Sequence, residues 1–110
     1  MKNKVTIEEA VQQLSKEQQQ RFTTVMKHGS MTVEYYVPKT KDLQTPHKQD
    51  ELYIIASGRS VFDHNGDKVH CKTGDVLFAP AGEQHHFENF SEDFATWVVF
   101  YGPEGGEKDS

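Results

Sequence analysis

Histidine and glutamate side chains stand at spacings that suit a metal site. His47 and Glu51 are four residues apart, and His85 follows the turn sequence Pro80-Ala81-Gly82. If residues 47–51 are extended, alternate side chains share a face, so His47 and Glu51 point the same way. Two imidazoles and one carboxylate leave open coordination positions, as in the facial triads of non-haem iron oxygenases. These three residues are therefore the candidate ligands for a divalent transition metal such as Fe, Mn, Ni, Co or Zn.

Each ligand also has a purely structural interpretation. His85 fits a buried, hydrogen-bonded histidine, and Glu51 fits a carboxylate at the exposed edge of a loop. Against the second interpretation, Glu51 opens the apolar run Leu52 to Ala56 in a phase that directs it inward. No catalytic acid, base or nucleophile is assigned beyond the ligands. The residues expected to line the pocket, from their phase or aromatic character, are Thr45, Gln49, Tyr53, Phe78, Phe87 and Trp97.

Short β-strands must position these side chains. Asn65-Gly66 is the strongest hairpin signal in the chain, and His28-Gly29-Ser30 predicts another hairpin. About eight strands in succession, with no stretch of helical period among them, predict an all-β sandwich or barrel. The expected strands are 22–27, 31–37, 52–56, 60–64, 67–71, 75–79, 84–90 and 94–101.

One short helix is expected before the strands. Thr6 and Glu9 have the spacing of a capping box, and an apolar stripe follows them. We expect this helix to cover one end or edge of the barrel. The predicted organisation is an N-terminal helix and connection (1–20), a barrel (21–102) and an irregular C-terminal tail (103–110).

The turn before His85 belongs to a longer pattern. Gly74, Pro80, Gly82, His85 and Asn89 occupy every fixed position of the second cupin motif. Over about residues 31–101 the chain resembles the small single-domain cupins, the conserved-barrel or cupin-2-like group. The resemblance implies a jelly-roll barrel, also called a double-stranded β-helix, with a bound divalent metal and often a homodimeric assembly.

The first motif of that family is incomplete. The family pattern has two histidines separated by one residue, then three residues, a glutamate, six residues and a glycine. His47, Glu51 and Gly58 match its last three fixed positions, whereas Thr45 stands where the first histidine is expected. The resemblance therefore implies a site with three ligands, and leaves open whether Thr45 or Gln49 replaces the fourth.

Two functions fit these observations. One is a metal-dependent enzyme acting on a small organic molecule, either dioxygenase-like or isomerase-like. The alternative is a module that binds a small molecule without catalysis. Fold-level analogy does not choose between them, because one fold hosts many unrelated functions.

Composition narrows the partners. The net charge of −5, with scattered lysines, argues against a nucleic-acid partner. No run approaches the ~20 apolar residues of a membrane span, and no apolar run follows the basic N-terminus as in a signal peptide. The lone Cys71 suits a reducing compartment, so we expect a cytoplasmic protein. A second copy of the chain is also expected as a partner, through Met31 to Val37 at an exposed sheet edge.

Overall fold

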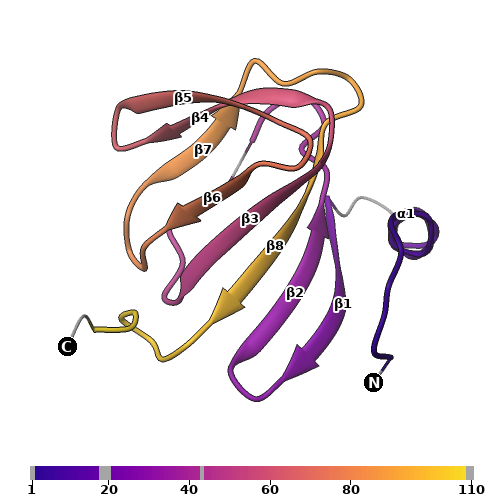
Figure 1. Ribbon diagram of the computed structural model, residues 1–110, viewed down its shortest axis with the longest axis horizontal. Coiled ribbons are helices and arrows are strands. Elements are labelled where there is room, and N and C mark those ends of the chain that lie inside the picture. Colours follow the sequence, from indigo (N-terminus) through magenta and orange to yellow (C-terminus); the bar gives the residue numbers. More distant parts are fainter. Residues whose placement is uncertain (1, 18–20, 43, 109–110) are drawn as a thin grey trace.

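The computed structural model describes residues 2–17, 21–42 and 44–108. In this part of the chain one helix precedes eight strands (Figure 1), as the sequence predicts. The elements are α1 (Ile7–Ser15), β1 (Phe22–His28), β2 (Met31–Tyr36), β3 (Asp50–Ser57), β4 (Arg59–His64), β5 (Asp67–Lys72), β6 (Val76–Ala79), β7 (His85–Glu88) and β8 (Ala95–Tyr101).

The strands form two sheets in the jelly-roll arrangement. The larger sheet has the strand order β1-β2-β8-β3-β6, and the smaller has the order β5-β4-β7. Each paired strand is antiparallel to its neighbour. In Figure 1 the smaller sheet lies across one end of the larger one, so the inward faces of both enclose a common interior. The expected all-β jelly-roll fold is therefore confirmed.

Aromatic side chains fill the interior between the sheets. The Tyr53 ring packs edge-on against Phe87 with ring centroids 5.0 Å apart, and the Phe62 ring lies 5.1 Å from Phe87 in a tilted arrangement. Such pairs contribute about 0.5–1.5 kcal/mol beyond the area they bury. The buried members of this core are Tyr36, Tyr53, Ile55, Phe62, Cys71, Ala79, Phe87, Phe94, Val98 and Phe100.

The helix forms as expected, and it packs on the outer face of the large sheet near its β1 edge. The Thr6 hydroxyl accepts a hydrogen bond from the Glu9 amide (3.1 Å), and the Glu9 carboxylate accepts one from the Thr6 amide (3.0 Å). This reciprocal capping box satisfies two amides that would otherwise have no partner at the helix start. Ala10 is buried against Tyr35 and Ala95, so α1 covers the outer face of the large sheet beside β1 and β2. The described part of the chain holds no helix with the length and apolar character needed to cross a membrane.

The strand bounds lie within two residues of the prediction. β3 spans Asp50–Ser57 where 52–56 was expected, but it does not reach His47, so residues 45–49 form a loop and the extended course considered for 47–51 is not found. β7 ends at Glu88 because Asn89 adopts a left-handed backbone (φ 50°), which interrupts the extended chain. The Asn65-Gly66 hairpin is as expected, with positive φ at both residues (53° and 93°).

The predicted role of residues 31–37 as a sheet edge is wrong. β2 is hydrogen-bonded on both sides, to β1 and to β8, so it has no free edge to offer. The edges of the large sheet are β1 and β6. The apolar residues on both sides of β2 are instead explained by the interior on one face and by α1 and the outer face on the other.

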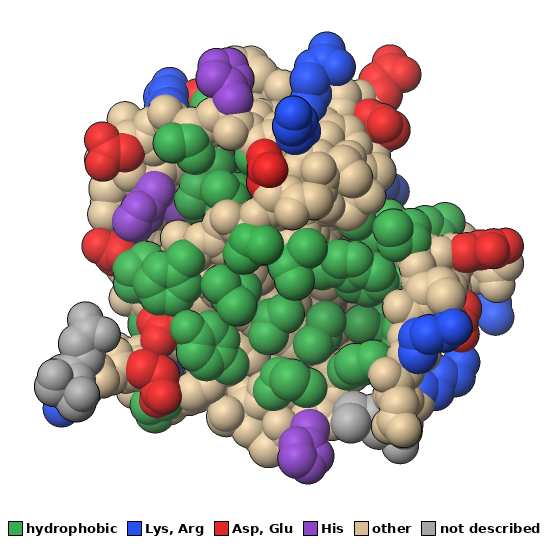
Figure 2. All heavy atoms as spheres, viewed as in Figure 1, with side chains coloured by type: hydrophobic (Ala, Val, Ile, Leu, Met, Phe, Trp, Pro, Cys, Tyr) green, Lys and Arg blue, Asp and Glu red, His purple; other side chains and the backbone are tan. Residues whose placement is uncertain are grey.

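The outer face of the large sheet is apolar. Val76 and Phe78 on β6 are 61% and 48% exposed, and Ile54 on β3 is also exposed. Figure 2 shows hydrophobic side chains gathered across this face, with charged side chains around their margin. The side chains of this sheet therefore divide into an enclosed set, which includes Glu51, and an exposed apolar set.

Candidate metal centre

Three side chains from the two sheets meet in the interior. Glu51 and Tyr53 point inward from β3, and His85 points inward from the first position of β7. The Nε2 atom of His85 lies 3.2 Å from Glu51 Oε2 and 2.8 Å from the Tyr53 hydroxyl. The Tyr53 hydroxyl donates to Glu51 Oε2 at 2.5 Å. The side chains of Glu51 and His85 are each 1% exposed, so both polar groups depend on partners within the protein.

His47 approaches the same carboxylate from outside. Its Nε2 atom lies 3.8 Å from Glu51 Oε1, while its side chain is 45% exposed. The His47 ring packs against Phe100, with ring centroids 4.4 Å apart, and its carbonyl accepts a hydrogen bond from the Gly82 amide (2.8 Å). Because β3 begins at Asp50, His47 lies outside the strand, and the alternation of side chains along a strand does not determine where it points. The loop nevertheless places its imidazole beside Glu51.

Glu51 Oε1 is buried and has no hydrogen-bond partner among the residues that the structure describes. Leaving a buried acceptor unsatisfied costs about 1–3 kcal/mol, and more for a charged group. A cation beside Oε1 would remove this cost. The nearby donors are a second carboxylate oxygen and two imidazole nitrogens, a set that transition metals accept. The donor types therefore suit a divalent transition metal, but within the described residues the ligand atoms of His47, Glu51 and His85 do not all lie within 4.8 Å of one another, so these side chains would have to close on an ion.

The His85 ring is oriented by a backbone carbonyl. Its Nδ1 atom lies 2.9 Å from the Glu83 carbonyl. Because a carbonyl oxygen only accepts, Nδ1 carries the hydrogen, so in the neutral ring Nε2 has a lone pair, and a cation would have to replace its contacts with Glu51 Oε2 and the Tyr53 hydroxyl. A backbone carbonyl that fixes the second nitrogen is the usual support of a metal-ligating histidine. Burial opposes protonation of His85, but the hydrogen bond and charge of Glu51 outweigh it and raise the pKa of His85.

Tyr53 contributes a hydroxyl that sequence analysis treated only as part of an aromatic lining. Burial, and then the charge of Glu51, raise the pKa of Tyr53 well above its usual value of 10. Tyr53 is therefore a neutral phenol and a hydrogen-bond donor at this site. Its hydroxyl also lies 2.7 Å from the side-chain oxygen of Gln44.

The loop before β3 holds the mouth of the interior in place. Asp42 accepts hydrogen bonds from the Tyr36 hydroxyl (2.6 Å) and from the Phe87 amide (2.7 Å). Its carboxylate also accepts from the Gln44 backbone and side-chain amides. Sequence reasoning missed Asp42 and Gln44, because a polar connection without periodicity gives no signal of which side chains turn inward.

Glu34 is a further carboxylate in the interior that the sequence did not reveal. It pairs with Val98, and Val98 pairs with Tyr53, so the three side chains share the enclosed face. Burial, and then the charge of Glu51, raise the pKa of Glu34 to about 7. The signal in the sequence was a lone glutamate in the middle of a strand of β-branched and aromatic residues. Burying a carboxylate costs free energy, so a glutamate at an inward-facing position of such a strand points to a role in the interior.

A cleft of about 350 Å³ opens beside His85 at this mouth. Thr45 lies on its wall and is exposed at the surface. The residues along its wall are Lys41, Asp42, Gln44, Thr45, Pro46, Gln84, His85 and His86. The cleft is therefore large enough for a small molecule.

The other residues expected in the pocket have different positions. Phe87 lies in the core, with its ring against Tyr53. Phe78 and Trp97 do not line the pocket, because they pair with Leu52 and Ile54 on the outer face of the large sheet. The Gln49 side-chain amide donates to the backbone carbonyls of Ser30 and Gly102 (2.8 and 2.9 Å), so it joins two loops rather than facing Glu51.

Comparison with known proteins identifies relatives of this architecture. The family model described as Cupin domain (Cupin_2) matches residues 32–101. A protein of Streptomyces coelicolor described as uncharacterized, SCO3923, is 37% identical over 85 residues, which are 76% of this chain and 81% of that protein. An acireductone dioxygenase of Cronobacter sakazakii is 38% identical over 64 residues, 54% of this chain and 36% of the enzyme. An oxalate-binding protein of Thermotoga maritima is 46% identical over 46 residues, 39% of this chain and 38% of that protein.

Solved structures share the fold. A protein of unknown function from Rhizobium leguminosarum superposes with a TM-score of 0.71 at 24% identity, covering 92% of this chain and 97% of that one. A cupin 2 conserved barrel domain protein from Salinispora arenicola gives a TM-score of 0.62 at 19% identity, covering 74% of each chain. Identities this low indicate the fold and not the activity.

Proposed function

This chain belongs to the cupin family, and on that premise we propose that it binds a divalent transition metal through His47, Glu51 and His85 and acts on a small organic molecule. The observation that carries the proposal is Glu51 Oε1, a buried carboxylate oxygen without a hydrogen-bond partner in the described chain, beside the His47 imidazole. A buried carboxylate oxygen without a hydrogen-bond partner is costly, and we expect one where a bound cation interacts with it.

The surrounding residues would have distinct roles around such a centre. A metal of this class supplies Lewis-acid or redox chemistry to a substrate bound at its open positions. Tyr53, as a neutral phenol, orients Glu51 through its hydroxyl and holds a proton close to His85. Glu34 carries an interior carboxyl whose pKa of about 7 lets it take up or release a proton near neutrality. The cleft beside His85 gives a small molecule access.

An oxidative reaction is the chemistry that we propose for this centre. It is supported by the open three-ligand set and by the similarity to the Cronobacter acireductone dioxygenase. This chain spans about a third of that enzyme, so the reaction is carried over as a class and not as a substrate.

Binding without catalysis is the second candidate. The similarity to the Thermotoga oxalate-binding protein supports it, as does the replacement of a motif histidine by Thr45. In this account Glu51 and His85 hold the metal, and the metal holds a small acid that is not transformed.

Metal-binding measurements followed by two probe molecules test both candidates. The chelator-treated protein is equilibrated with Fe²⁺, Mn²⁺, Ni²⁺ or Zn²⁺, and Glu51→Gln serves as the variant that lacks the carboxylate. Oxygen consumption with acireductone would support the enzyme, and saturable binding of oxalate without turnover would support the binding module. A folded protein whose metal content is the same with and without Glu51 would overturn both.

We also propose that the chain forms a homodimer through the outer face of the large sheet. Two transverse rows of side chains cross this face, Tyr35–Trp97–Ile54–Val76 and Val33–Val99–Leu52–Phe78. Monomers rarely expose a continuous apolar patch of this kind. A second copy offers the same flat apolar surface, so a two-fold axis would cover both faces at once.

A further inference from the structure

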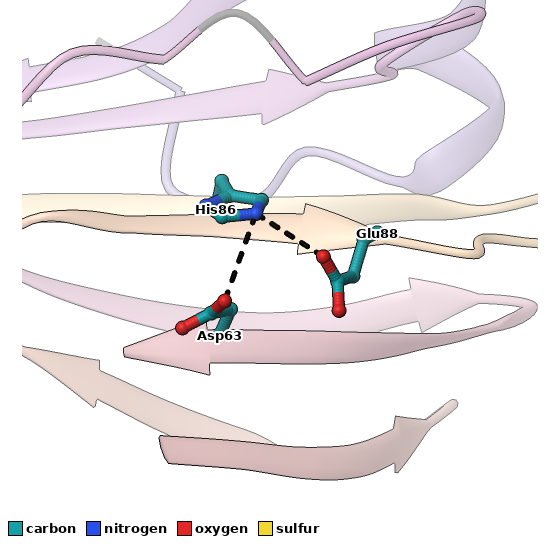
Figure 3. Close-up of side chains that lie close together, drawn as sticks. All are labelled: Asp63, His86 and Glu88. Carbon is teal, nitrogen blue, oxygen red and sulfur yellow. Dashed lines mark hydrogen bonds and ion pairs between the residues drawn. The ribbon is translucent and has the colours of Figure 1, made fainter. Parts of the chain in front are cut away.

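A second group of metal-ligating side chains lies on the outer face of the small sheet (Figure 3). Asp63 on β4 pairs directly with His86 on β7, and Glu88 follows two residues later on the same face. His86 Nε2 lies 3.3 Å from Glu88 Oε2 and 3.9 Å from Asp63 Oδ2. One ligand atom from each residue falls within 4.8 Å of the other two. Two paired strands thus present one imidazole and two carboxylates at a common point.

Both carboxylates are held so that one oxygen faces His86. Asp63 Oδ1 accepts a hydrogen bond from the Gly66 amide at 2.8 Å, which leaves Oδ2 toward the imidazole. Glu88 Oε1 pairs with Lys68 Nζ at 2.8 Å, which leaves Oε2 toward the imidazole. Hydrogen bonds that fix the second atom of a ligand are what orients the ligands of metal sites. The two carboxylate ligands therefore have independent supports.

We propose that Asp63, His86 and Glu88 form a second, external site for a divalent transition metal, represented by Zn²⁺. With bonds of about 2.0–2.1 Å, two ligands of a tetrahedral zinc lie about 3.3–3.4 Å apart. The 3.3 Å separation of His86 Nε2 and Glu88 Oε2 already matches this value, Asp63 Oδ2 has to approach His86 Nε2 by about half an ångström, and the ligand atoms of Asp63 and Glu88 start within 4.8 Å of each other. Three protein ligands leave the remaining positions to water.

The external site is independent of the centre around Glu51. His85 and His86 are adjacent in a strand, so their side chains point to opposite faces of the small sheet. His85 is buried in the interior, whereas the His86 side chain is 44% exposed. The proposal therefore stands whether or not the interior centre binds a metal.

A self-compensating ion network is the competing explanation for the same cluster. Protonated His86 and Lys68 together balance the charges of Asp63 and Glu88, and such a network needs no metal. The two explanations differ in what they predict for zinc. An ion network does not bind zinc, whereas a metal site binds zinc with an affinity that depends on His86.

Calorimetric titration of zinc chloride into the chelator-treated 110-residue protein tests the proposal. Glu51→Gln is the background in which the external site is measured alone. In that background we expect His86→Ala to weaken zinc binding at least tenfold. His64→Ala is the matched control, because His64 pairs with one carboxylate, Glu83 (2.9 Å), instead of two, and we expect it to leave the affinity unchanged.

The outcomes separate the explanations. Unchanged zinc affinity in His86→Ala would overturn the external site, as would an equal loss in His64→Ala. If His86→Ala fails to fold by circular dichroism, Glu88→Gln replaces it, with the same expected loss and the same overturning result. Loss of all zinc binding in Glu51→Gln would also overturn it, because the zinc would then lie in the interior. Retained binding that depends on His86, with no interior binding in the wild type, would instead contradict only the proposed function.

Discussion

The Nε2 atom of His47 lies 3.8 Å from Glu51 Oε1, a buried oxygen that has no hydrogen-bond partner within residues 2–17, 21–42 and 44–108. The other oxygen of the same carboxylate is contacted by Tyr53 and His85. One half of Glu51 is thus satisfied by the interior, and the other half faces a half-exposed imidazole. This asymmetry is the physical basis for proposing a cation at this position.

Replacing His47 separates metal binding from folding. Because the His47 side chain is 45% exposed, His47→Ala should change the free energy of unfolding in chelator by no more than about 0.5 kcal/mol. It should weaken transition-metal binding at least tenfold, as measured by calorimetry. His28→Ala, an exposed histidine at the end of β1, is the control and should do neither. Equal metal affinities in the two variants would remove His47 from the ligand set.

Removing one hydroxyl tests the buried hydrogen-bond cluster. Tyr53→Phe deletes the donor to Glu51 and the contacts with His85 and Gln44. Because buried partners are then left unsatisfied, the free energy of unfolding should fall by about 1–3 kcal/mol in urea denaturation. Tyr101→Phe, a half-buried tyrosine at the end of β8, is the matched control. A Tyr53→Phe protein as stable as the control would show that the cluster contributes nothing to folding.

Glu34 makes the stability of the metal-free protein depend on pH. Its pKa is about 7 in the folded state against 4.5 when unperturbed, so the unfolded chain releases this proton first as pH rises. The contribution of Glu34 is fully present below pH 4.5, falls between pH 4.5 and 7, and is lost above that range. Glu34→Gln should therefore be more stable than the wild type by about 2–3 kcal/mol at pH 8, with no difference at pH 4.

Chemical denaturation at the two pH values measures this difference. Glu104→Gln, an exposed carboxylate in the C-terminal segment, should show no comparable gain at pH 8. A Glu34→Gln protein that is less stable than the wild type at pH 8 would mean that the Glu34 carboxylate is stabilising as an anion, contrary to its enclosed position.

The apolar outer face should control assembly. Placing a charge in the middle of it by Phe78→Glu should convert the proposed homodimer into a monomer, as measured by light scattering across a concentration series. Val69→Glu is the matched control, because Val69 is 49% exposed, like Phe78 (48%), but lies on the small sheet. A wild-type protein that is monomeric at all concentrations would contradict the proposed interface.

The sequence predicted the elements better than it predicted the faces of some strands. The capping box of Thr6 and the Asn65-Gly66 turn are local, so their residues alone were enough to place them. Phe78 and Trp97 were placed inward because aromatic residues suit either side of a sheet with two apolar faces. Periodicity cannot distinguish an enclosed face from an exposed face when both are apolar.

Only those site residues that belong to a motif with fixed spacing could be predicted from the sequence. Glu51 and His85 followed from motif spacing, and the structure places their side chains 3.2 Å apart. Gln44 and Asp42 act through a loop whose course depends on long-range hydrogen bonds to Tyr53 and to the Phe87 amide. No local pattern encodes such contacts, so the sequence could not identify them.

A crystal structure of the metal-loaded protein, with anomalous diffraction measured at the metal's absorption edge, would show directly whether the interior binds a metal. We expect an anomalous peak in the interior, about 2.0–2.2 Å from His47 Nε2, Glu51 Oε1 and His85 Nε2. A well-folded protein with no peak near Glu51, after equilibration with iron, manganese, nickel and zinc, would contradict it.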